Sequence, residues 1–193
     1  DKTMKVKKDP SVSGPVVIDR QATSSNGGRH LYVFGRLEMK GVTLTGGYKT
    51  GVSGADGGAV VVNSGSAFFQ ECSFSGNTAS GNGGAVLVWK GSASFQECSF
   101  SLNTAQSAGA VYLNSAGSAL FQECSFNQNT ASRQGDDLYV RYDAMSVTII
   151  NPTTSMDIFD SGNKLVTACT TTDTDSCADG GLPGHICTVP NPP

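Results

Sequence analysis

The chain has 193 residues, of which 24 are glycine and only 15% are charged, and its formal net charge at pH 7 is -3. This length fits one domain, or one domain with a short appendage. The slightly acidic balance argues against a nucleic acid partner, because phosphate binding needs clustered lysine and arginine. No apolar run approaches the about 20 residues that span a bilayer.

The first part of the chain is polar and then strand-like. Residues 1–15 contain two prolines and a short cluster of lysines, and we interpret them as a frayed, solvated lead-in. Short strands are predicted at residues 16–19 and 31–33. Residues 37–44 alternate apolar and polar side chains at a period of two, which predicts a longer strand.

One block is then written three times within residues 57–132. The sequence Phe-Gln-Glu-Cys-Ser-Phe begins at Phe69, Phe95 and Phe121, so the copies are 26 residues apart. Each copy is followed by Asn-Thr-Ala and preceded by a run of small residues that leads into valine. A fixed period of this length is typical of a solenoid.

Weaker copies flank the three clean ones. Residues 37–47 form a degenerate first copy, in which Met39 aligns with Phe69 and the extra residues lie in a loop. An eroded copy follows the third one and ends near residue 150. We therefore predict a solenoid over 1–150 and a C-terminal cap and cysteine-containing tail over 151–193.

The repeat predicts an all-β fold, a right-handed parallel β-helix of about five rungs. Equivalent residues of successive rungs should stack about 4.8 Å apart. Six columns that stay apolar should fill the core, with a bend at Gln70-Glu71 where the alternation shifts. These columns begin at Val60, Val62, Ala67, Phe69, Cys72 and Phe74. The corner asparagines should form a structural amide ladder of Asn77, Asn103 and Asn129.

The pairing of two motifs at fixed phase resembles a known repeat. Gly-Gly-Ala-Val at 57–60 and 83–86 is paired with Phe-x-x-Asn at 74–77 and 100–103. This pairing resembles the repeat of chlamydial polymorphic outer membrane proteins, and is similar to right-handed β-helix repeats in surface proteins of other bacteria, algae and protists. The resemblance covers roughly residues 31–150. It implies an adhesin-like or surface-structural role.

The six cysteines fall into two groups. Cys72, Cys98 and Cys124 form a column whose parallel side chains do not favour a bridge, so we predict buried free thiols and no metal site. The tail holds the other three, and we expect at least one disulfide among them. The tail cysteines are Cys169, Cys177 and Cys187. Six cysteines in a charge-poor chain favour an extracellular setting.

One outward column is apolar in every rung. It lies between two core columns, so alternation predicts that it faces solvent, and an exposed apolar strip indicates contact with a partner. The candidate interaction surface consists of Tyr32, Val61, Leu87, Trp89, Tyr112 and Tyr139. A plain β-propensity effect, or cover by the tail, is the alternative explanation.

Two further functions remain open. Enzymes on the pectin-lyase-type β-helix, which process polysaccharides, place carboxylates and basic residues on neighbouring rungs, and Asp136, Asp137 and Arg141 cluster on the last rung. The same acids are also good turn formers. A stacked column of Thr78, Thr104 and Thr130 raises ice binding as a third hypothesis.

The sequence thus favours a non-catalytic, secreted or cell-surface module with a structural or adhesive role, which self-assembles into a larger structure. No cofactor, metal, nucleic acid or membrane span is expected. The expected partners are other protein subunits or cell-surface glycans.

Overall fold

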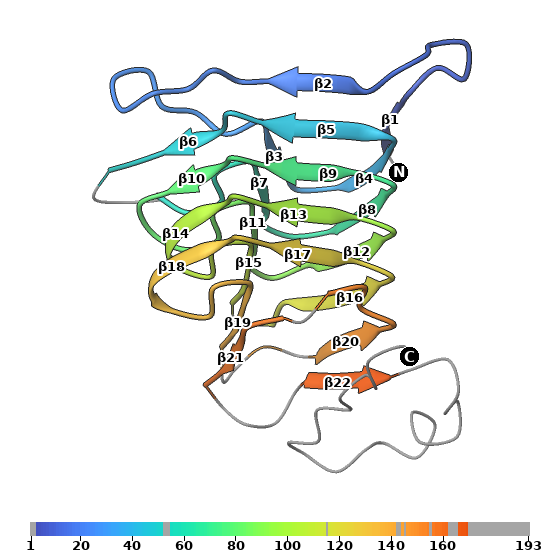
Figure 1. Ribbon diagram of the computed structural model, residues 1–193. Helices are drawn as coiled ribbons and strands as arrows, with labels where there is room; N and C mark the ends of the chain where they lie inside the picture. The colour runs from blue at the N-terminus through green and yellow to red at the C-terminus, as the bar shows by residue number, and fades with distance from the viewer. Residues whose placement is uncertain are drawn as a thin grey trace.

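The structure is a computed structural model, and it confirms an all-β parallel solenoid of about five turns (Figure 1). It describes residues 3–51, 55–114, 116–141, 144, 146–154, 156–161 and 166–169. Within these residues every strand belongs to one of four sheets, and all pairings between strands are parallel. A complete turn of the chain contributes one strand to each sheet in order.

We name the sheets A to D. Sheet A contains β1 (Thr3–Lys7), β4 (Arg36–Lys40), β8 (Ser66–Gln70), β12 (Ser92–Gln96), β16 (Ser118–Gln122), β20 (Ser146–Ile150) and β22 (Val166–Cys169). Sheet B contains β2 (Val16–Asp19), β5 (Val42–Thr45), β9 (Ser73–Ser75), β13 (Ser99–Ser101) and β17 (Ser125–Asn127). Sheet C contains β6 (Tyr48–Lys49), β10 (Thr78–Ala79), β14 (Thr104–Ser107) and β18 (Thr130–Gln134). Sheet D contains β3 (Leu31–Val33), β7 (Val60–Val62), β11 (Val86–Val88), β15 (Val111–Leu113), β19 (Leu138–Val140) and β21 (Ile158–Asp160).

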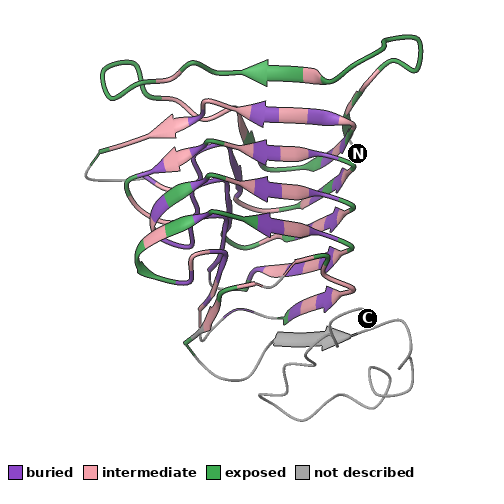
Figure 2. Ribbon diagram, in the orientation of Figure 1, coloured by how far each residue is buried: buried purple, intermediate pink, exposed green. Residues whose placement is uncertain are grey.

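The predicted register is confirmed in the core columns. Phe95 pairs with Phe69 on one side and with Phe121 on the other, and all three side chains are fully buried. Their rings stack at centroid distances of 5.1 and 5.0 Å, with interplanar angles of 6° and 9°. Figure 2 shows buried stretches alternating with more exposed ones along strands of sheets A and B. The core is therefore built from stacked identical side chains.

The degenerate first copy also takes its predicted place. Met39 pairs with Phe69 and Leu44 pairs with Phe74. Both residues are buried in the same core as the phenylalanines. The extra residues of this turn lie after β6, where they do not interrupt the stack.

The ends of the chain join the sheets more fully than the sequence indicated. Thr3–Lys7 forms β1, which pairs along its whole length with β4, so the interpretation of residues 1–15 as a frayed lead-in is wrong. Lys5 Nζ lies 2.8 Å from Glu38 Oε2, so one of the terminal lysines is held by an ion pair. At the other end, β21 and β22 extend sheets D and A into the segment predicted as cap. The rest of the predicted tail lies outside the described residues.

The asparagine ladder is confirmed, and it runs through the buried corner after sheet B. Asn77 Nδ2 donates to Asn103 Oδ1 at 3.1 Å, and Asn103 Nδ2 donates to Asn129 Oδ1 at 3.0 Å. Each side-chain oxygen also accepts a backbone N–H of the preceding turn. The last amide donates to Asp137 Oδ1 at 2.9 Å, so an aspartate ends the ladder.

The predicted bend after Gln70 has a specific backbone conformation. Glu71, Glu97 and Glu123 all have positive φ, between 52° and 53°. Most residues pay a steric penalty at positive φ, because Cβ approaches the following carbonyl oxygen. Glycine has no Cβ, and the short polar side chain of asparagine can bond to the local backbone, so both are better tolerated there. All three glutamates are exposed, so the penalty is not offset by burial of the side chain.

Replacing Glu97 with asparagine is therefore expected to raise the free energy of unfolding by about 0.5 to 1 kcal/mol. The change relieves the backbone and removes one charge from a column of like charges. Urea unfolding at low salt measures the effect, with Gln96→Asn on the neighbouring strand residue as control. A loss of stability in Glu97→Asn would contradict the assignment of strain to this bend.

Candidate functional site

The outward residues of sheet D form one column, as predicted. Tyr32 pairs with Val61, Val61 with Leu87, Leu87 with Tyr112, and Tyr112 with Tyr139. The expectation that this column faces solvent is wrong for its three middle members. The exposed fractions of Val61, Leu87 and Tyr112 are 3%, 3% and 9%.

The chain itself covers these residues. After sheet C it turns back across the outer face of sheet D, where Ala108 is fully buried and packs in a second small core with the column. Gly57 approaches so closely that a Cβ atom there would lie 2.6 Å from Val61 Cγ2. A small residue therefore stands at this crossing, glycine at 57 and 83 and Ala108 in the third copy, all at positive φ. The crossing covers the middle of the outer face of sheet D.

The C-terminal end of the column is an aromatic stack. The rings of Tyr112 and Tyr139 lie 4.7 Å apart at an interplanar angle of 8°. The ring of Phe159 continues the stack at 5.1 Å from that of Tyr139. Tyr112 and Tyr139 therefore contribute to packing, whereas Tyr32, at the N-terminal end of the column, is exposed.

At that N-terminal end a hollow with a volume of about 320 Å³ opens beside Trp89. We call it the Trp89 hollow. It is lined by Arg29, Tyr32, Asp56, Val61, Asn63, Leu87 and Trp89. The exposed fractions of Tyr32 and Trp89 are 48% and 37%, so both rings are accessible. Four of the six predicted surface residues thus meet at one site, joined by three polar residues that sequence reasoning missed.

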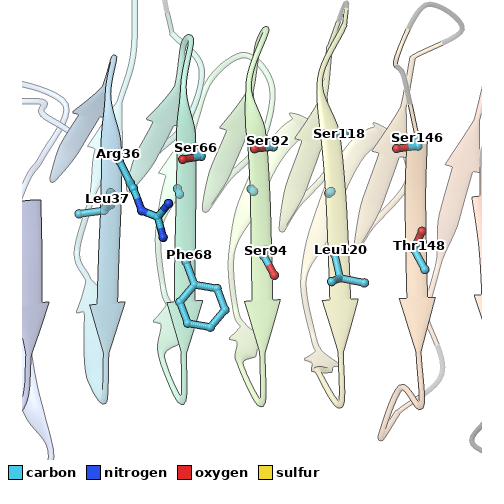
Figure 3. A pocket seen from close by; sticks show the side chains of 13 residues that line it. Arg36, Leu37, Ser66, Phe68, Ser92, Ser94, Ser118, Leu120, Ser146 and Thr148 are labelled. Carbon is cyan, nitrogen blue, oxygen red and sulfur yellow. The ribbon is translucent and has the colours of Figure 1, made fainter. Parts of the chain in front are cut away.

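A second opening, of about 400 Å³, follows the outer face of sheet A (Figure 3). We call it the serine groove, because one row of its side chains is serine in four successive strands. That row consists of Ser66, Ser92, Ser118 and Ser146. The neighbouring row alternates apolar and hydroxyl side chains, namely Phe68, Ser94, Leu120 and Thr148. Figure 3 shows the Arg36 side chain reaching from β4 toward β8 at one end of the groove.

The serine groove offers hydrogen bonds rather than acid–base chemistry. Hydroxyl groups donate and accept, and they suit an extended polar molecule that runs across the strands. Arg36 supplies the charge at this groove, and its Nε donates to Glu38 Oε1 at 3.0 Å. The sequence carried a signal for this groove, because a serine stands three residues before the first phenylalanine of every clean block.

The residues proposed for an enzyme have structural partners. Asp136 Oδ1 accepts the backbone N–H of Ala131 at 2.6 Å. Asp137 is 7% exposed, and its two oxygens accept the Asn129 amide and the backbone N–H of Asp157, both at 2.9 Å. Arg141 Nη1 donates to Asn114 Oδ1 at 2.7 Å. These contacts close the last turn of the solenoid.

Asp137 gives the fold a predictable response to pH. Burial raises the pKa of this carboxyl group above its ordinary value of 3.8, although the Asn129 amide and the Asp157 N–H act to lower it. Negatively charged Asp136 and Asp157 also act to raise it. The folded chain therefore holds this proton more tightly than the unfolded chain does.

Protonation of Asp137 therefore stabilises the folded chain. This contribution is fully present below pH 3.8 and is lost as the pH rises through the raised pKa of the folded state. We expect the free energy of unfolding of the wild-type protein, relative to Asp137→Asn, to fall across that interval. Urea unfolding at a series of pH values measures the difference. A difference that grows as the pH rises would contradict the raised pKa.

The cysteine column is structural in the described part of the chain. Cys72, Cys98 and Cys124 are free and buried, as predicted. The neighbouring thiols and burial together raise the pKa of Cys98, so it stays protonated at neutral pH. No group of three metal-ligating side chains is found among the described residues. The predicted disulfide among Cys169, Cys177 and Cys187 lies outside them, since only the backbone of Cys169 is described.

The threonine column is also aligned. Thr78 pairs with Thr104, and Thr104 pairs with Thr130, at the start of the strands of sheet C. Ice binding at this column stays a prediction.

Comparison with family models, characterised proteins and solved structures finds no match to this chain. The resemblance to polymorphic outer membrane protein repeats therefore depends on the paired motifs and on the solenoid itself. Among the described residues there is no helix long and apolar enough to cross a membrane.

Proposed function

We propose that this chain is a non-catalytic extracellular module with a structural and adhesive role, related to polymorphic outer membrane protein repeats. Its partners are other protein subunits or cell-surface glycans. The observation that carries the proposal is that the two openings lie on outer sheet faces, over a core of stacked side chains. The core residues repeat from turn to turn, as does the serine row of the groove, whereas the second row of the groove and the lining of the Trp89 hollow vary.

The contacts of the acidic residues support binding over catalysis. A general acid or base must reach the proton that it transfers. Both oxygens of Asp137 already accept hydrogen bonds, and Asp136 holds the turn before β19. Neither residue lines the Trp89 hollow or the serine groove.

An open strand edge supports assembly into a larger structure. β2 lies at the N-terminal end of sheet B, and β5 is its one neighbour among the described strands. Val17 and Ile18 in β2 have exposed fractions of 50% and 41%. An exposed apolar edge strand is a template for pairing with another chain.

A retention and turnover assay tests the proposal. Immobilised wild-type protein is exposed to soluble neutral and anionic polysaccharides, and both retained glycan and released reducing ends are measured. We expect retention without product, and the same result for Asp136→Ala. Product release that is lost in Asp137→Ala and in Asp136→Ala, with both variants folded by circular dichroism, would establish the enzyme instead.

The assembly part of the proposal has its own test. A charge in the exposed edge, as in Val17→Lys, is expected to reduce the concentration-dependent association of the wild-type protein in sedimentation velocity. Leu102→Lys, at an exposed corner away from that edge, is the matched control. A wild-type protein that stays monomeric at millimolar concentration would contradict assembly through β2.

A further inference from the structure

We propose that the Trp89 hollow is a binding site for one neutral pyranose sugar unit of a glycan. This inference rests on the proposed adhesive function and names the ligand class for one of its surfaces. Three properties of the hollow point to this class: two accessible aromatic rings, polar groups of both hydrogen-bonding kinds, and charges that balance.

The ring of Tyr32 is held in place by contacts on three sides. Its hydroxyl group donates to Asn63 Oδ1 at 3.2 Å, the guanidinium carbon of Arg29 lies 5.3 Å from its ring centroid, and the Phe34 ring lies at 4.9 Å. A ring fixed before binding loses little conformational entropy when a ligand packs on it. The C–H face of a pyranose ring is apolar enough to pack against such a surface.

Trp89 supplies the second ring, two turns along the solenoid from Tyr32. Its backbone N–H donates to Val62 O at 2.8 Å, which fixes the corner that carries it. The indole N–H donates no hydrogen bond within the described residues, so it is available to a hydroxyl group. Val61 and Leu87, both buried, form the apolar floor between the two rings.

Asp56 provides an oriented acceptor. Its Oδ1 atom accepts the backbone N–H of Asn82 at 2.7 Å and the Asn82 amide at 3.0 Å. In the part of the chain that the structure describes, Oδ2 accepts no hydrogen bond. A carboxylate anchored through one oxygen presents the other in a fixed direction, as recognition of a sugar hydroxyl requires.

The charges of the hollow favour a neutral ligand. Arg29 and Asp56 are the charged residues that line it, and they carry opposite charges. Burial lowers the pKa of Arg29, although the nearby Tyr32 and Asp56 act to raise it. A sialic or uronic acid would gain from Arg29 but would be repelled by Asp56, so a polyhydroxylated neutral ring fits better.

The volume limits the ligand to a small unit. About 320 Å³ lies at the lower end of the range of small-molecule pockets, roughly 300 to 1,000 Å³. One sugar unit therefore enters the hollow, and the rest of the glycan extends over the solvent-exposed rim. An aromatic side chain of a peptide is the competing occupant, and it is included in the test.

Trp89 is the single tryptophan of the chain, so its fluorescence reports on this site alone. The wild-type protein is titrated with the methyl glycosides of glucose, galactose, mannose and N-acetylglucosamine. The methyl glycoside of galacturonic acid, with its carboxylate ionised, N-acetylneuraminic acid and a tyrosine-containing tripeptide are titrated in parallel. We expect a saturable change in emission with at least one neutral glycoside, and at least tenfold weaker binding of the charged sugars and the tripeptide.

Variants test whether the glycoside that changes the emission binds in the Trp89 hollow. Asp56→Asn is expected to weaken glycoside binding at least tenfold, and Trp89→Ala to abolish it in saturation-transfer NMR, whereas Trp89→Phe retains part of it. Phe68→Ala, which changes an exposed aromatic residue of the serine groove, is the matched control and should leave binding unchanged. Stability is checked by urea unfolding for each variant.

The outcomes separate this inference from the proposed function. If polysaccharides are retained by the wild-type protein, but no glycoside changes the emission and Trp89→Ala retains them equally, the hollow is not the sugar site and adhesion lies elsewhere. Preferred binding of the tripeptide would also overturn the sugar assignment. If no glycan is retained and no partner protein associates, the adhesive function itself fails.

Discussion

Replacing Asn103 with alanine is expected to destabilise the solenoid by about 3 to 5 kcal/mol, since each buried polar group left without a partner costs about 1 to 3 kcal/mol. Asn103 is fully buried at the centre of the ladder. Its side chain accepts from the backbone and the amide of Asn77, and donates to Phe74 O and to Asn129 Oδ1. Alanine would remove all four bonds at once and would leave the buried Asn77 backbone N–H without its acceptor, although the Asn77 amide still donates to Leu44 O and Asn129 Oδ1 still accepts the backbone N–H of residue 103.

Urea unfolding followed by circular dichroism measures this loss. Ser101→Ala is the matched control, because Ser101 faces outward two residues earlier and makes one hydroxyl contact, to Ser75 at 3.3 Å. It should change the free energy of unfolding by less than about 0.5 kcal/mol. A cost for Asn103→Ala within that range would mean that the ladder does not stabilise the fold.

Replacing Phe95 with alanine is expected to cost about 3 to 5 kcal/mol, as is typical of large-to-small changes at fully buried aromatic positions. Phe95 stacks on Phe69 and Phe121 and meets Phe74 and Phe100 edge to face, at centroid distances of 5.9 and 5.2 Å. Its neighbours belong to three successive turns, so the cavity cannot close without moving the stack.

The control for this change is again Phe68→Ala, one residue from a core phenylalanine but with 36% of its side chain exposed. It should cost less than about 1 kcal/mol. Equal costs at the two positions would contradict the assignment of inward and outward columns. Melting temperatures measured at one protein concentration check the order of the two variants independently.

The core was predictable because the repeat is nearly exact. Once three copies are aligned, a column that keeps the same apolar residue in every copy is expected to face inward, and this placed Phe69, Cys72 and Phe74 correctly. The asparagine corner was predictable for the same reason, because a side chain that stacks on itself can bond to its own copy. Its terminal partner, Asp137, was interpreted as a turn residue or a catalytic acid, because an aspartate that follows a column of asparagines does not continue the repeat.

The outer face of sheet D was not predictable from alternation alone. A period of two assumes that a strand has one face in the core and one face in solvent. Here the returning chain covers Val61 and Leu87, and the signal for it was the small residue four positions before each, Gly57 and Gly83. A built Cβ at either glycine would collide with the backbone carbonyl of the following valine, at 2.5 and 2.2 Å.

The polar residues of the Trp89 hollow were not predicted from the sequence. Arg29 lies in a loop that has no equivalent in the clean copies. Asp56 stands one period before Asn82, but its carboxylate takes the place of an amide, so the repeat does not mark it as a site residue. Both line the Trp89 hollow, Arg29 from the loop before β3 and Asp56 from the segment before β7. The pairing of β1 with β4 was not predicted, because residues 3–7 match no copy of the repeat and their register could not be inferred by alignment.

Repeated residues form the core of this solenoid, and we propose that recognition occurs at outward residues that vary, above all in the Trp89 hollow. The most direct test compares binding of wild-type and Trp89→Ala proteins to one panel of immobilised neutral glycans, at a temperature where both are folded. We expect loss of binding in Trp89→Ala, with a free energy of unfolding within about 1 kcal/mol of the wild type. Undiminished binding by a folded Trp89→Ala protein would contradict it.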